Sequence, residues 1–87
     1  MTDKAKLPDS MTITLRSPID IEGQTITTMT LREPTAGQIE NARRAGVGET
    51  VAIRLIALCS GTPEAAVRKM KARDYKEAAD FCLGFFI

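Results

Sequence analysis

Residues 11–38 constrain the fold most, because the apolar spacing changes there from a period of two to a helix start. Apolar and polar side chains alternate in Met11–Ser17, and four threonines lie in Thr25–Arg32. Such alternation is typical of strands with one face in water, and threonine favours a strand over a helix. We therefore expect two strands in these two runs. The side chains expected on their inner faces are Met11, Ile13, Leu15, Thr27, Met29 and Leu31.

The connection between these strands contains Pro18 and Gly23. Proline cannot donate to a strand ladder, so we expect Pro18 to end the first strand. The remaining residues 19–24 are too many for a two-residue turn, and Gly23 suits a position with positive φ. The pattern predicts a hairpin with a longer loop that contains glycine.

A helix start follows the second strand at Pro34 and Thr35. Thr35 and Gln38 have the spacing of a capping box, which predicts a helix over Ala36–Ala45 that ends at one of the two following glycines. The apolar face of this helix is thin. We expect it to lie on the surface and to fix the hairpin to the rest of the chain.

The next predicted helix, Glu49–Ser60, is apolar around most of its circumference. Arg54 and Ser60 are its only strongly polar members after the cap. A helix that is apolar on most sides is buried on most sides. We expect this helix at the centre of the core, ended by Gly61.

Two further helices are expected nearer the C-terminus. Thr62 as N-cap and Pro63 at the first position predict the start of the third helix. Asp74 and Glu77 have a second capping-box spacing and predict the start of the fourth. The residues expected to face inward from the third helix are Val67 and Met70.

These signals together predict an α+β fold, an N-terminal two-stranded antiparallel β-hairpin followed by a bundle of about four short helices. We expect residues 1–10 to form a flexible tail and residues 11–87 a single domain, with the hairpin at 11–33 and the helical part at 35–87. A chain of 87 residues buries only about 60% of the surface that its unfolded form exposes. Self-association or a partner is therefore the expected source of additional stability.

The charged and reactive residue types argue against an enzyme. Twelve Lys and Arg against eleven Asp and Glu give a net charge of +1, with no bulk attraction to nucleic acid. The chain has no His, and neither Cys59 nor Cys82 has an evident base partner. Asp20 and Glu22 alone offer too few oxygen ligands for a cation. We expect no catalytic residue, no cofactor and no metal site.

Signals for secretion and membrane insertion are also missing. Residues 1–10 lack the apolar segment of a signal peptide, and no apolar run approaches the roughly 20 residues of a membrane span. We expect a cytoplasmic protein without a membrane partner, in which Cys59 and Cys82 are buried thiols.

One basic cluster, residues 68–73 (RKMKAR), has two interpretations. It could be the recognition end of a helix-turn-helix formed by the second and third helices. It could instead be a solvated helix face, with its cations near a helix C-terminus. The low net charge and the single nearby aromatic residue, Tyr75, favour the solvated face.

The last predicted helix carries a wide apolar arc, which also has two interpretations. The arc closes the core of the protein, or its end protrudes and binds a partner helix or another subunit. Both stay open at the level of sequence. The residues that we assign to partner binding are Phe81, Leu83, Phe85, Phe86 and Ile87.

The pair Pro18–Ile19 is followed by Leu31–Arg32 and Pro34. With this pattern the chain resembles the phage tail assembly chaperone family of Mu-like contractile-tailed phages. The resemblance covers most of residues 11–87, and these five residues are its most specific part. Proteins of that family typically open with a strand that runs into a Pro-Ile pair, followed by a Gly, a second strand ending in Arg-x-Pro and a helix start. The further positions that match this pattern are Ile13, Leu15, Gly23, Ile26, Met29 and Gly37.

The resemblance implies a non-catalytic role in tail morphogenesis. It implies a chaperone in the cytoplasm of the bacterial host that binds the tape measure protein and keeps it soluble. A wide apolar helical surface suits such a client, and many copies along one client imply self-association. The tail tube protein would later displace the chaperone. The alternatives are a small helix-turn-helix-like DNA-binding regulator, or a structural virion tail component whose hairpin adds edge to edge.

Overall fold

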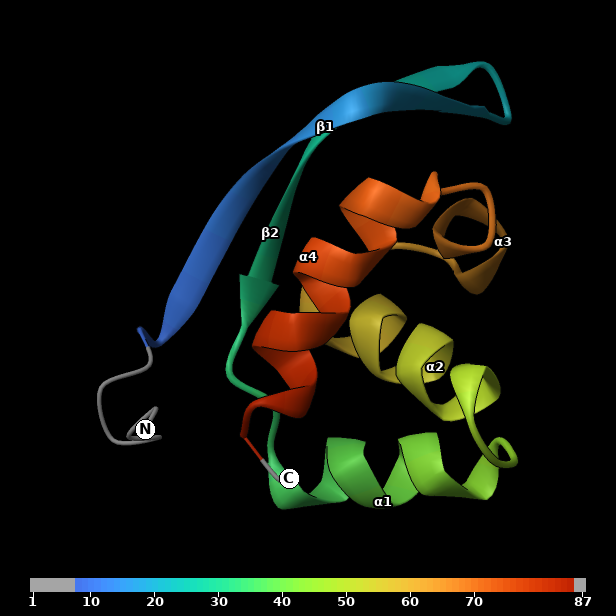
Figure 1. Ribbon diagram of the computed structural model, residues 1–87. Coiled ribbons are helices and arrows are strands. Elements are labelled where there is room, and N and C mark those ends of the chain that lie inside the picture. Colours follow the sequence, from blue (N-terminus) through green and yellow to red (C-terminus); the bar gives the residue numbers. More distant parts are fainter. Residues whose placement is uncertain (1–7, 86–87) are drawn as a thin grey trace.

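The computed structural model of the protein describes residues 8–85, and it consists of a long two-stranded antiparallel hairpin packed on four helices (Figure 1). The α+β fold predicted from the sequence is confirmed. The elements in chain order are β1 (Ser10–Ile21), β2 (Gln24–Arg32), α1 (Ala36–Arg44), α2 (Glu49–Ser60), α3 (Glu64–Val67) and α4 (Ala72–Leu83).

The hairpin is longer and its turn tighter than predicted. Pro18 does not end β1, which continues to Ile21 and pairs there with Gln24. The connection is the two-residue turn Glu22–Gly23, with φ of 49° and 78°. Positive φ at both positions is what a type I′ turn requires, and its twist matches that of the flanking strands. The prediction of a longer loop was wrong, because proline is tolerated where the ladder is already interrupted.

That interruption lies in the middle of β1. Thr14 pairs with Thr28 and Ile19 with Ile26, so residues 15–18 of β1 face a single residue of β2. The backbone N–H groups of Arg16 and Ser17 donate instead to the two carboxylate oxygens of Asp74, each at 3.1 Å. Pro18 follows directly and has no N–H to satisfy. The N–H groups of Arg16 and Ser17, which the bulge withdraws from the ladder, are therefore paired.

Asp74 is 1% exposed and is the one buried charged residue among the described residues. The sequence predicted it to begin the fourth helix in a capping box with Glu77. That prediction was wrong: α4 begins two residues earlier, its N-cap is Lys71, and no side chain caps it. The carboxylate serves β1 instead, 58 residues away in sequence.

One face of the hairpin lies on the helices and the other lies in water. α4 packs on both strands and α2 packs on β2. The alternation predicted for β1 is confirmed, since Ile13 and Leu15 are buried whereas the threonines between them are exposed. On β2 the buried side chains are Met29 and Leu31, but Thr27 is exposed. The inward-facing position moves to Ile26 there, because Thr27 and Thr28 are both exposed and the alternation of β2 breaks opposite the bulge.

The first two helices agree closely with the sequence. The side chain of Thr35 accepts from the Gln38 N–H and the Gln38 side chain accepts from the Thr35 N–H, which confirms the capping box of α1. α2 has the predicted bounds and ends at Gly61, whose φ is 69°. Leu55 and Ile56 are fully buried, as expected for a central core helix.

The third helix is shorter than the sequence suggested. α3 is a single turn with Pro63, not Thr62, at the N-cap. The prediction that Val67 and Met70 face inward is confirmed, because both are buried in the core.

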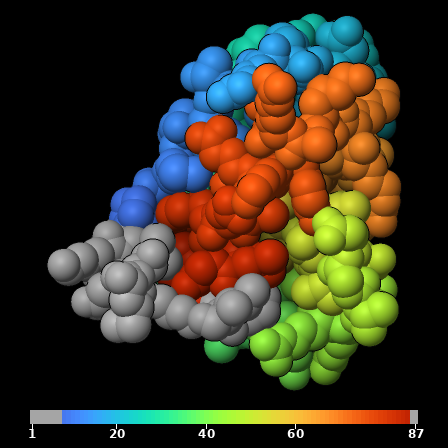
Figure 2. All heavy atoms as spheres, viewed as in Figure 1, coloured from blue at the N-terminus to red at the C-terminus, as the bar shows by residue number. Residues whose placement is uncertain are grey.

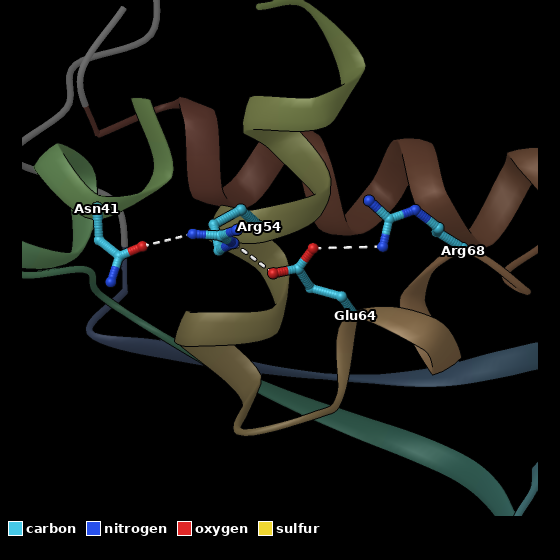
Figure 3. Close-up of polar contacts among 4 residues, drawn as sticks. All are labelled: Asn41, Arg54, Glu64 and Arg68. Carbon is cyan, nitrogen blue, oxygen red and sulfur yellow. Dashed lines mark hydrogen bonds and ion pairs between the residues drawn. The ribbon is translucent and has the colours of Figure 1, made fainter. Parts of the chain in front are cut away.

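Arg54 joins three of the helices on the outer side of α2 (Figure 3). Its guanidinium donates to the Asn41 side chain of α1 and pairs with Glu64 at the start of α3. Glu64 also accepts from Arg68, at 3.3 Å. This network explains why a strongly polar residue interrupts an otherwise apolar helix. Arg32, by contrast, has an exposed side chain with no hydrogen bond to another described residue.

We expect Asp74→Ala to lower the free energy of unfolding by about 2–4 kcal/mol, because it leaves two partly buried N–H groups of β1 without an acceptor. Asp74→Asn should cost about half as much, since the amide offers one acceptor oxygen. Asp80→Ala on the same helix is the control, because Asp80 forms an exposed pair with Lys76 and should cost less than about 0.5 kcal/mol. Urea unfolding measures all three. Equal losses for Asp74→Ala and Asp80→Ala would contradict the role of the carboxylate.

Candidate functional site

An open, mainly apolar groove of about 790 Å³ lies between α4 and the corner where α1 passes into α2. Figure 2 looks onto this part of the molecule, with the spheres of α4 beside those of the α1–α2 corner. The walls include Val51 and Ala52 of α2, and Ala79 and Leu83 of α4. Small alanine side chains leave the space between the two helices unfilled. No residue of the hairpin lines the groove.

Val47 stands at the edge of this groove and is 86% exposed. It lies between Gly46 and Gly48, whose φ values of 148° and 61° suit glycine and turn the chain from α1 into α2. Among the described residues it is the one large hydrophobic side chain classed as exposed. A single exposed valine is ordinary, but one that borders an apolar groove extends the apolar surface available to a partner.

Polar groups mark one side of the groove. The Tyr75 hydroxyl of α4 donates to the Glu49 carboxylate at the start of α2 and so joins the two groove-forming helices. Burial, and then the hydrogen bond to this carboxylate, raise the pKa of Tyr75 to about 12. Lys76 also lines the groove and forms an exposed ion pair with Asp80 at 3.0 Å.

The structure separates the five residues that the sequence assigned to partner binding. Phe81 is 5% exposed and belongs to the core, where its ring meets that of Phe85 edge to face at a centroid distance of 5.1 Å. Leu83 is half-buried and lines the groove, and Phe85 is half-buried against the core. Phe86 and Ile87 lie outside the described residues.

Sequence reasoning missed Val47 and the groove. The available signal was a valine between two glycines in a helix connection, which cannot form part of an apolar helix face. Whether such a valine is exposed depends on how α1 and α2 pack, and a pattern of residue types does not reveal that packing.

The two thiols lie in the core. Cys59 and Cys82 are free and buried, as expected from their apolar surroundings. The hydrogen bond with Cys59 and the burial of the side chain both raise the pKa of the Cys82 thiol. A buried thiol of raised pKa is a poor nucleophile.

The basic cluster does not form a recognition helix. α3 has four residues, which is too short to lie in a DNA groove, and Arg68 pairs with Glu64 within the same segment. Lys69 donates from Nζ to the carbonyl oxygen of Asp20 at 3.0 Å. These contacts support the interpretation of a solvated face. In residues 8–85 no group of three metal-ligating side chains gathers, and no helix has the length and apolar character to cross a membrane.

Tyr75 is the only tyrosine, so an ultraviolet absorbance titration reports its ionisation directly. We expect a pKa of about 12 in the native protein, compared with about 10 in an unfolded chain. Because the folded pKa is the higher one, the stability that Tyr75 contributes is present below about pH 10 and is lost as the pH rises toward 12. Glu49→Gln should lower the native pKa, since it removes the negative charge. A native pKa of 10 would contradict the contact.

Comparisons with known proteins place the chain in a family. A family model described as "Phage tail assembly chaperone proteins, E, or 41 or 14" matches residues 12–87, nearly the whole chain. Searches of curated proteins and of solved structures find no match. The matched region includes the hairpin from Thr12 onward, the four helices and every residue named as lining the groove. The chain belongs to the phage tail assembly chaperone family.

Proposed function

We propose that the protein binds the tape measure protein during tail assembly and keeps it soluble, and that the groove between α2 and α4 is the binding surface. The family supplies the role in tail assembly. The observation that carries the choice of surface is the apolar groove with Val47 exposed at its edge.

The shape of the groove favours a helical segment of the client. Two helices form its walls, and a third apolar helix packs well into the space between two others. Val47 then covers one side of the bound helix and Leu83 contacts it from α4. Burying an exposed valine contributes about 1.5 kcal/mol, and the groove is open to solvent, so the affinity of each copy is modest.

Modest affinity fits a chaperone that must be released. Many copies along one long client protect it together, and the tail tube protein displaces them one at a time as the tube grows. Such holding requires no chemical step. Masking of apolar client helices in the cytoplasm of the bacterial host is the whole activity proposed.

The five residues that the sequence assigned to partner binding have different roles in this proposal. Leu83 contacts the client from the wall of the groove. The assignment of Phe85, Phe86 and Ile87 to client binding rests on the sequence. Phe81 acts from the core, because its edge-to-face contact holds the Phe85 ring in place.

We expect Val47→Asp to abolish co-purification with the tape measure protein of the same genome and to leave that client insoluble on co-expression. A charge at the edge of the groove opposes entry of an apolar helix. Because Val47 is 86% exposed, the thermal midpoint should stay within about 2 °C of wild type. Pull-down from the soluble fraction and thermal unfolding give the two readouts.

Ala65→Asp is the matched control, since it places the same charge on an exposed position of α3 outside the groove. It should keep the client soluble. Retained binding by Val47→Asp would move the client to another surface, and absence of binding by the wild-type protein would refute the client. Recovery of the protein in finished virions would favour a structural tail component instead.

A further inference from the structure

The two outer edges of the hairpin differ. The alternation of hydrogen-bonded and non-hydrogen-bonded pairs shows which backbone groups point outward. The Glu33 N–H donates to the Asp9 carbonyl at 2.8 Å, so this pair is a hydrogen-bonded one. Pairs alternate along an antiparallel ladder. Thr12↔Thr30 and Thr14↔Thr28 are therefore non-hydrogen-bonded pairs, and their N–H and C=O groups face away from the partner strand. The 3.0 Å contact between the Thr12 and Thr30 hydroxyls fits such a close pair.

The free edge of β1 is interrupted. Arg16 and Ser17 give their N–H groups to Asp74, and Pro18 has none to give. The Asp20 carbonyl oxygen already accepts a hydrogen bond from Lys69 Nζ. A strand added to β1 would lose its ladder after Thr14, because the bulge begins there. These are devices by which proteins prevent strand addition at an edge.

The free edge of β2 carries no such protection. Thr28, Thr30 and Arg32 are exposed, and no hydrogen bond from a described residue outside the hairpin reaches the backbone of β2. The strand has no proline, and it has no charged side chain between Gln24 and Leu31. The alternation of β2 breaks at Thr27 and Thr28, opposite the bulge, so the regular part of this edge runs from Thr28 to Arg32. Uncharged and rich in threonine as far as Leu31, it is a template for pairing with another strand.

We propose that β2 pairs antiparallel with β2 of a second copy, giving a four-stranded sheet in the order β1–β2–β2–β1 across a two-fold axis. A second copy fits because its β2 offers the same outward groups in reverse order. The uncharged stretch produces no like-charge repulsion at the axis, and the antiparallel arrangement sends the two Arg32 side chains to opposite ends of the new ladder. The assembly stops at two chains, because the outer edges are then the interrupted β1 strands.

This dimer leaves the groove open, since no strand residue lines it. Two copies joined through β2 therefore present two grooves to one client. The inference does not depend on the identity of that client, and it is tested on the purified chain alone.

The test compares two proline variants at directly paired positions. Thr30→Pro removes an outward N–H from β2, and Thr12→Pro removes one from β1; both lose the same hydroxyl contact. Sedimentation equilibrium should show a wild-type dimer. Thr30→Pro should raise the dissociation constant of the dimer about tenfold or more, because the substitution removes one donor from each of the two symmetry-related chains. Thr12→Pro should leave the constant within about twofold.

Amide hydrogen exchange of the wild-type protein gives a second test that requires no variant. As concentration rises through the dimerisation range, the N–H groups of Thr28 and Thr30 should become protected, whereas those of Thr12 and Thr14 should not. A monomer at all concentrations, equal effects of the two prolines, or protection of the β1 threonines would each overturn the proposal. An open series of larger assemblies would also overturn it.

Discussion

The carboxylate of Asp74 is the interaction on which the rest of the structure depends. It comes from α4, and it accepts the two N–H groups that β1 withdraws from the ladder. Without it the bulge would leave polar backbone groups unpaired at the contact between hairpin and helices. The bulge in turn lets β1 continue through Pro18 while apolar side chains on both sides of it still reach the core. Two hydrogen bonds to one carboxylate thus fix the hairpin on α4 at the point where the register of its strands shifts.

Local patterns in the sequence predicted the elements whose causes are local. The alternation in Met11–Ser17, the Thr35–Gln38 capping box and the apolar helix ended by Gly61 all appear in the structure as expected. Asp74 could not be understood in this way. An acidic residue three positions before Glu77 has the same spacing whether it caps its own helix or accepts from a strand 58 residues away. The difference is made by tertiary packing, which spacing does not encode.

The candidate site shows the same limit. The sequence directed attention to the aromatic end of α4, and the structure places Leu83 of that set in the groove, whereas Phe81 lies in the core against Phe85. The groove also needs the first turn of α2 and Val47, and Val47 lies in a connection that the sequence shows only as glycine-rich. A surface formed by the convergence of α1, α2 and α4 leaves no periodic signal in any one of them.

The molecule keeps its two candidate interaction surfaces on different elements. The groove is formed by helices, and the unprotected edge belongs to β2, so occupation of one does not obstruct the other. This separation matters for a protein that acts on a long client in many copies. Pairing through β2 raises the effective concentration of the second groove once the first has bound, which strengthens holding without tightening any single contact. Each groove can still release its own segment, because the affinity of one copy stays modest. The apolar groove and the unpaired strand edge together allow the assembled copies to bind the client strongly, although each copy binds it weakly.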